Sequence, residues 1–171
     1  MRGAAGNKNT KGASLIELVM VMLVLALFGV TIYTLIATGA DTQKRIMNEK
    51  NAQSDARVAL SYINVRLRQN DESGKIEIKK VDITGENAIL IQNRSSGYEY
   101  DTWIYNYEGG LYECLVDPGE QPNELFSFYV IDAELFETSI DGESGRITNT
   151  VYYSFDGEWK HLSSSIYLRS R

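Results

Sequence analysis

Few side chains in this sequence could carry out chemistry. Cys114 is the only cysteine and His161 the only histidine, so an intrachain disulfide and a cysteine cluster for zinc are excluded and histidine-assisted catalysis is poorly supplied. We interpret Cys114 as a buried thiol, because a free cysteine usually behaves as a small apolar residue. The segment DGESG at 141–145 lacks the alternating ligand spacing of a calcium loop, and we interpret it as an exposed turn. The sequence therefore predicts no enzyme, no cofactor and no metal site.

One acidic residue, Glu17, has an unusual position. It is followed by 23 residues, 18–40, without a single charge. An α-helix needs about 20 apolar residues to cross the hydrocarbon core of a bilayer, and a single segment in lipid must be helical because its backbone groups have no other partners. The sequence predicts one membrane-spanning helix with a carboxylate at its edge.

Three other interpretations of this segment are open. A secretory signal peptide would have a small-residue cleavage site at 38–40, but the apolar stretch 18–36 is longer than the usual 7 to 15 residues or so. A plain uncleaved anchor is compatible with the length. Ser14 and Glu17 also fit a capping box, in which both side chains accept hydrogen bonds at a helix start, and a carboxylate suits the positive end of the helix dipole.

The segment KGASLIE at 11–17, followed by about twenty apolar residues, resembles the leader and N-terminal helix of type IV pilins and of the pseudopilins of type II secretion and competence systems. The resemblance implies that a prepilin peptidase cleaves between Gly12 and Ala13 on the cytoplasmic side. It implies that the new amine of Ala13 is methylated and that Glu17, the fifth mature residue, is needed for assembly.

Two features depart from the usual pattern of that family. Ala13 stands where Phe or Met is commoner, and Thr34 stands at the twenty-second mature position, where a proline often interrupts the helix. Gly29 and Gly39 are alternative points of local softness, because Gly is a poorer helix former than Ala by about 1 kcal/mol.

The resemblance also implies partners and a location. The expected partners are a prepilin peptidase, other pilin or pseudopilin subunits, the assembly platform and the membrane. The expected location is a single-pass membrane protein with an extracytoplasmic C-terminal domain, which enters a pilus or pseudopilus on assembly. A minor subunit is favoured, because the cysteine-closed loop of some major pilins is impossible here. No nucleic-acid contact is inferred, since residues 13–171 carry 14 bases and 23 acids, a net charge of −9.

We expect four segments. The resemblance implies a basic leader at 1–12 and a transmembrane assembly helix at 13–40, and composition and periodicity predict an amphipathic helix at 41–70 and a β-rich domain at 71–171. In the third segment, apolar residues recur every three or four positions, which indicates one buried stripe on a helix. The stripe consists of Ala52, Ala56, Ala59, Leu60, Ile63 and Leu67.

Alternating apolar and polar residues bounded by turn residues predict strands after residue 74. The predicted strand segments are 75–83, 88–93, 98–107, 111–116, one or two within 124–136, 147–155 and 159–168. Asp156-Gly157 predicts a tight hairpin turn between the last two. A helix followed by six to eight antiparallel strands predicts an α+β domain, with the helix laid across one sheet face.

Three classes of function fit the sequence to different degrees. A filament subunit accounts for Gly12, Glu17 and the long helix, and is the function that we expect. The alternative is a single-pass membrane-anchored extracytoplasmic binding module, which explains the anchor and the sheet but not those two residues. An anchored enzyme would need a catalytic constellation, and the 23 acids are spread as on a solvated surface.

Overall fold

The computed structural model describes the backbone of residues 10–95 and 97–168, and side chains from residue 15 onward. The chain divides into two compact units, Met1–Met47 and Asn48–Arg171. Helix α1, Thr10–Gln69, contributes residues to both. The helix begins three residues before the predicted start at residue 13. The sequence TKG at 10–12 contains no proline, and its single glycine opposes helix formation by only about 1 kcal/mol.

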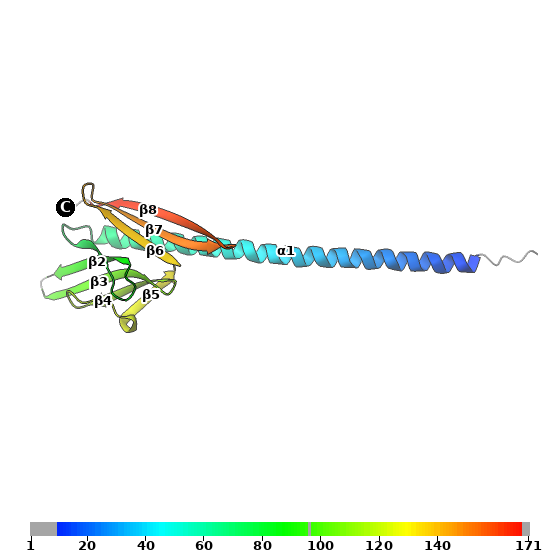
Figure 1. Cartoon of the computed structure of the whole chain (residues 1–171), viewed down its shortest axis with the longest axis horizontal. Helices are drawn as coiled ribbons and strands as arrows, with labels where there is room; N and C mark the ends of the chain where they lie inside the picture. Colours follow the sequence, from blue (N-terminus) through cyan, green and yellow to red (C-terminus); the bar gives the residue numbers. More distant parts are fainter. Residues whose placement is uncertain (1–9, 96, 169–171) are drawn as a thin grey trace, which may run out of the picture. The chain divides into compact units, whose positions relative to one another are not determined.

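Eight antiparallel strands form the rest of the second unit (Figure 1), in agreement with the predicted α+β class. They are β1 (Ile76–Lys80), β2 (Asn87–Ser95), β3 (Tyr98–Tyr107), β4 (Gly110–Val116), β5 (Ser127–Asp132), β6 (Leu135–Asp141), β7 (Arg146–Phe155) and β8 (Glu158–Tyr167), with a short 3-10 helix, η1 (Glu124–Phe126), before β5.

The strands make two sheets, with the orders β1-β2-β3-β4-β5 and β6-β7-β8, so the prediction of a single sheet is wrong. The break falls in the two-residue connection between β5 and β6. There the backbone N–H of Ala133 donates to the carbonyl of Gly109, 2.9 Å away, and the buried Ala133 side chain packs into the core. The chain therefore leaves the first sheet at Asp132 and starts the second at Leu135.

The predicted hairpin turn at Asp156-Gly157 is confirmed. Both residues have positive φ angles, 56° and 81°, and they connect β7 to β8. This two-residue turn needs positive φ at both central positions, which Asp tolerates and Gly adopts freely. Glu108-Gly109 makes the same kind of turn between β3 and β4, with φ angles of 44° and 78°.

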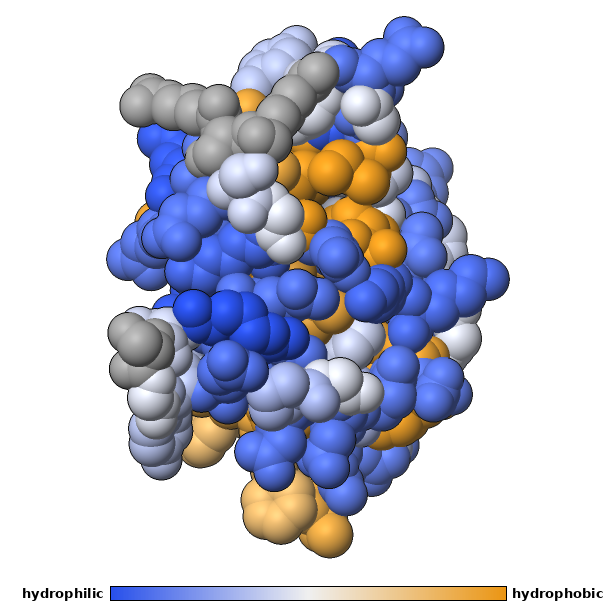
Figure 2. Space-filling model, turned by 90° about the vertical axis from the view of Figure 1, so that its left-hand side faces the viewer, coloured by the Kyte–Doolittle hydropathy of each residue, from blue (hydrophilic) through white to orange (hydrophobic). Residues whose placement is uncertain are grey.

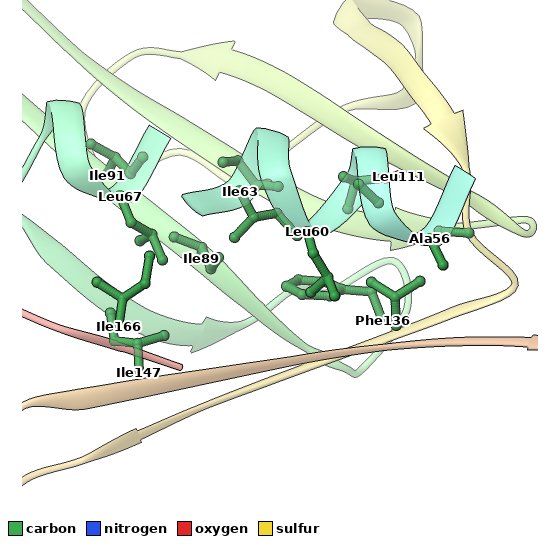
Figure 3. Close-up of a cluster of buried hydrophobic side chains, with 14 of the residues drawn as sticks. Ala56, Leu60, Ile63, Leu67, Ile89, Ile91, Leu111, Phe136, Ile147 and Ile166 are labelled. Atoms are coloured by element: carbon green, nitrogen blue, oxygen red, sulfur yellow. The ribbon is translucent and has the colours of Figure 1, made fainter. Parts of the chain in front are cut away.

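The main core lies between the second half of α1 and both sheets. Figure 1 shows this half of the helix between the strands β6–β8 and the strands β2–β5. Figure 3 shows helix residues such as Ile63 and Leu67 pointing toward Ile89 of the first sheet and Ile147 of the second. Each fully buried aliphatic side chain of this kind stabilises the fold by about 1.5–3 kcal/mol. The predicted stripe is the buried face of the helix, although it contacts two sheets instead of one.

A second cluster occupies the opposite face of the five-stranded sheet, beneath the segment 117–126. Trp103, Tyr105 and Cys114 are each 2% exposed or less. The Trp103 indole N–H donates to the carbonyl of Glu120, 3.0 Å away. The prediction that Cys114 is a buried thiol is confirmed.

Candidate assembly site on helix α1

The N-terminal part of α1 exposes apolar side chains on every side. Leu15, Leu25 and Ile36 are 68%, 64% and 68% exposed, and the large apolar residues between them are 48–74% exposed. Within residues 10–95 and 97–168, α1 is the one helix long and apolar enough to cross a membrane. Apolar side chains without protein neighbours are stable when lipid surrounds them, so this segment is compatible with a single-pass anchor.

Four threonines interrupt the apolar surface without leaving free hydroxyl groups. The hydroxyls of Thr34, Thr38 and Thr42 donate to backbone carbonyls three or four residues earlier, at 2.8–2.9 Å, and Thr31 donates to the carbonyl of Leu27. A hydroxyl satisfied within its own helix carries little penalty in lipid, because no unpaired donor is left. The threonines therefore do not prevent insertion.

Glu17 is the charged group of this surface. Its side chain is exposed among the apolar side chains of Leu15, Ile16 and Leu18, and no basic side chain in the described part of the chain lies within ion-pair distance. A carboxylate at the centre of a membrane helix costs about 2.5–3.5 kcal/mol, and less near its edge. A positively charged group from a neighbouring chain, or a new amine on the same chain, would reduce this free-energy penalty if it came close to the Glu17 carboxylate.

The capping-box interpretation of Glu17 is wrong for the uncleaved chain. A capping box requires the helix to begin at Ser14, whereas α1 begins at Thr10, so Ser14 and Glu17 lie inside the helix. The backbones of Gly12 and Ala13 are also helical, while their side chains and residues 1–9 lie outside the described residues. Cleavage after Gly12 and methylation of Ala13 therefore stay predictions.

A polar clamp joins the same helix to the five-stranded sheet. The guanidinium of Arg66 donates to both carboxylate oxygens of Glu113 on β4, and its Nε lies 2.9 Å from Oε2. Tyr62, one turn earlier, donates its hydroxyl to Glu113. The Glu113 side chain is 7% exposed and that of Arg66 is 37% exposed. The clamp therefore satisfies a nearly buried carboxylate with two donors from one helical turn.

The clamp changes the protonation equilibria of its members. Burial, together with the hydrogen bond to Glu113, raises the pKa of Tyr62. Burial by itself would lower the pKa of Arg66, but the hydrogen bond with Tyr62 and the attraction of Glu113 outweigh it and raise that pKa. Both shifts favour a neutral phenol beside a charged guanidinium. The sequence gives only a weak sign of this clamp, the four-residue spacing of Tyr62 and Arg66.

The three-stranded sheet is held to the helix by two polar contacts with β8. The Asn64 amide donates to the Ser164 hydroxyl, 2.8 Å away, and the Lys160 ammonium lies 2.8 Å from a carboxylate oxygen of Glu49. Sequence analysis missed both contacts, because they join residues 100 or more positions apart.

The turn at 141–145 has the local structure expected for an exposed loop. The Asp141 carboxylate accepts hydrogen bonds from the backbone N–H of Glu143 and the hydroxyl of Ser144. The bond from Ser144, followed by that from Glu143, lowers the pKa of Asp141. These carboxylate oxygens serve the turn itself, as the exposed-turn interpretation predicts.

Comparison with known proteins gives one match. Neither the curated proteins nor the solved structures contain a match to this chain. The family model described as a domain of unknown function, DUF4860, matches residues 54–152. This range begins in the docked part of α1 and ends in β7. Because the match covers more than half of the sequence, the chain belongs to the DUF4860 family.

Proposed function

We propose that this chain is a structural subunit, a minor pilin or pseudopilin, of a type IV pilus, competence or type II secretion filament. Before assembly it is inserted in the cytoplasmic membrane, with its C-terminal domain extracytoplasmic. The observation that carries the proposal is the single carboxylate of Glu17 on the exposed apolar surface of a helix that continues into the core of the β-rich domain.

Cleavage after Gly12 would create a cation close to Glu17, which has no basic partner among the side chains that the structure describes. The new amine of Ala13 carries a positive charge at nearly the same depth as Glu17, four residues away. In a bundle of staggered helices, the amine of one subunit meets the Glu17 carboxylate of a neighbour, where a low dielectric strengthens the attraction. An unpaired charge in that environment is strongly unfavourable, so the pair favours one axial register of subunits.

The second candidate function is a single-pass membrane-anchored binding module. The exposed apolar segment and the β-rich domain fit such a module equally well. It assigns no role to Gly12 or to the carboxylate of Glu17, and for this reason we favour the filament subunit.

Replacement of Glu17 by valine separates the two functions. The full chain is expressed in a strain with an active prepilin peptidase, and mature mass and recovery in sheared filaments are measured. We expect Glu17→Val to begin at Ala13 and to enter the membrane, but to be absent from filaments. The matched control is Thr34→Val, which removes a hydroxyl already satisfied within the same helix and should assemble normally.

Two results would count against this proposal. Entry of Glu17→Val into filaments at the wild-type level would show that the carboxylate has no role in assembly. A wild-type chain that stays uncleaved at Gly12 in the presence of the peptidase would favour the anchored module. A Gly12→Phe variant provides the reference for an inserted but uncleaved precursor.

A further inference from the structure

Charge is distributed unevenly along the chain. Residues 95–145 contain 12 acidic residues and no Lys, Arg or His, so every basic residue lies outside this range. Glu113 and Asp101 form ion pairs with Arg66 and Arg94. In the described part of the molecule, the exposed carboxylates around β5 have no basic side chain within ion-pair distance. This part of the surface therefore attracts cationic groups.

Exposed apolar residues lie within the acidic region, on η1 and β5. Figure 2 shows apolar side chains protruding at the bottom of a mainly hydrophilic face, where Figure 1 places η1. Leu125, Phe126 and Phe128 are 86%, 68% and 67% exposed. We call these three residues, with Glu120 and Glu124, the acidic edge. Because β5 is a terminal strand of its sheet, one side of it has no partner strand, and an exposed apolar group of this kind marks an interaction site.

A second unpartnered surface lies between α1 and β8, the terminal strand of the three-stranded sheet. Two hollows of about 470 and 490 Å³ follow this boundary. Arg57, Ser61, Val65 and Arg68 line them from the helix, and Asp71 lines the second hollow beside Arg68. The lining residues of β8 are Leu162, Ser163, Ser165, Ile166 and Tyr167. We call this surface the arginine groove.

The arginine groove carries positively charged side chains, which the acidic edge lacks. Neither Arg57 nor Arg68 has a carboxylate within ion-pair distance among the residues that the structure describes, and Val65 is 48% exposed. The groove therefore offers the guanidinium groups of Arg57 and Arg68, with the Asp71 carboxylate at one end, an exposed apolar side chain and a strand edge without a partner strand. The Glu113 side of α1 is occupied by the clamp, so the groove is on the open side toward β8.

We propose that the acidic edge of one copy of this chain docks in the arginine groove of the next copy. Opposite charges meet, apolar side chains cover each other and two unpartnered strand edges come together. The contact uses two different surfaces, so each docked copy presents a new free edge and a new free groove, and the contact can repeat from copy to copy along a filament. The inference rests on the proposed function, because a filament supplies such neighbours.

The same charges exclude two other occupants. Two acidic edges facing each other would repel, which disfavours a symmetric contact between like surfaces. An anionic lipid surface would be repelled by Glu120 and Glu124, so insertion of Leu125 and Phe126 into such a membrane is also disfavoured. A second copy is the occupant that the charges favour.

Disulfide trapping tests the contact in cells that express the full chain. The double variant Leu125→Cys/Ser61→Cys places one thiol on the acidic edge and one in the groove. We expect oxidation to give a ladder of multimers from the double variant and only monomer from either single variant. The buried Cys114 gives little background, and Cys114→Ser in each variant removes it.

Charge reversal provides the second half of the test. In the double-cysteine chain, Arg57→Glu/Arg68→Glu should reduce the ladder at least about tenfold, because like charges then face each other. Adding Glu120→Lys/Glu124→Lys should restore it. This rescue distinguishes docking from misfolding, and Arg57→Gln/Arg68→Gln should give an intermediate yield.

Four results would overturn the inference. They are no ladder while the chain is present in sheared filaments, a disulfide-linked dimer from Leu125→Cys alone, a ladder unaffected by charge reversal, and a reversed-charge variant that the lysine substitutions do not rescue. In the first case the proposed function stands and only the docking mode is wrong. Loss of the proposed function appears separately, as wild-type chain without cleavage at Gly12 or without filaments.

Discussion

The clamp between α1 and the five-stranded sheet predicts an asymmetric response to mutation. In Arg66→Met, the Glu113 carboxylate keeps only the Tyr62 hydroxyl as a donor, although its side chain is 7% exposed. In Glu113→Gln, the charge left behind is that of Arg66, whose side chain is 37% exposed and can turn to water. Removing the arginine should therefore destabilise the fold more than neutralising the glutamate.

The size of the effect follows from the burial of the two partners. Removing one partner of a fully buried pair costs about 3–5 kcal/mol. Since Arg66 is more than a third exposed, solvent screens its contribution, and we expect a loss of about 2–3 kcal/mol for Arg66→Met and about 1 kcal/mol for Glu113→Gln. The double variant Arg66→Met/Glu113→Leu leaves no unpaired charge and should lose about 1 kcal/mol or less, because apolar side chains of similar volume often replace a buried pair without loss.

Urea unfolding of the full chain in detergent measures these differences. The fluorescence of Trp103, which is 2% exposed in the core, should report unfolding of the β-rich unit. The matched control is Arg57→Met on the same helix, whose arginine has no ion pair in the described structure, and its effect should stay within about 0.5 kcal/mol. The urea m-value should not change among the variants.

A refutation would take one of two forms. If Glu113→Gln destabilises the fold as much as Arg66→Met, the cost does not come from a carboxylate stranded in a dry site. If the double variant loses the sum of the single effects, the two residues do not act as a pair.

Two further predictions concern single side chains. Cys114 should react with a thiol reagent at least about a hundredfold more slowly in the folded chain than in urea. The reason is that a local opening with a free energy of about 3 kcal/mol exposes the thiol only rarely. Equal rates would show that the thiol is accessible in the folded chain. The hydrogen bond to Glu124 raises the pKa of Tyr107 to about 12, and burial, followed by the bond to Asp132, raises the pKa of Tyr129 to about 12. Because the fold favours both protonated phenols, their contribution to stability is present below about pH 10 and is lost as the pH rises through about 12. Absorbance titration should therefore lose its latest-ionising component in Tyr107→Phe/Tyr129→Phe, and an unchanged curve would contradict this assignment.

The pattern of neighbouring residues was sufficient to predict the elements whose structure depends on residues close together in the sequence. The strand predicted at 98–107 has the same bounds as β3, and the stripe that includes Ile63 and Leu67 is buried as expected. The Asp156-Gly157 turn was predictable because its required backbone angles restrict the residue types. Each of these features is determined within a few residues of sequence.

The features that sequence analysis missed depend on residues far apart in the chain. Alternation shows which residues of a strand share a face, but it does not show which strand lies beside it, so the division into two sheets after Asp132 could not be predicted. The clamp joins residues 47 positions apart, and Glu113 in a strand looks like any solvent-facing acid. The acidic region at 95–145 was visible in the sequence, but its relation to the free edge of β5 needed the structure.

The family match and the candidate assembly site occupy different parts of α1. The match begins at residue 54, close to where the helix first buries side chains against the sheets, with Ala56 at 1% exposed. It therefore covers most of the buried core, although Tyr153 and Ile166 lie beyond its end, and it excludes Gly12, Ala13 and Glu17. The buried residues of the matched part belong to two clusters, one between α1 and both sheets and one on the opposite face of the five-stranded sheet. The proposed assembly chemistry belongs to residues outside the matched range, so membership of the family and assembly into a filament have to be tested with different residues.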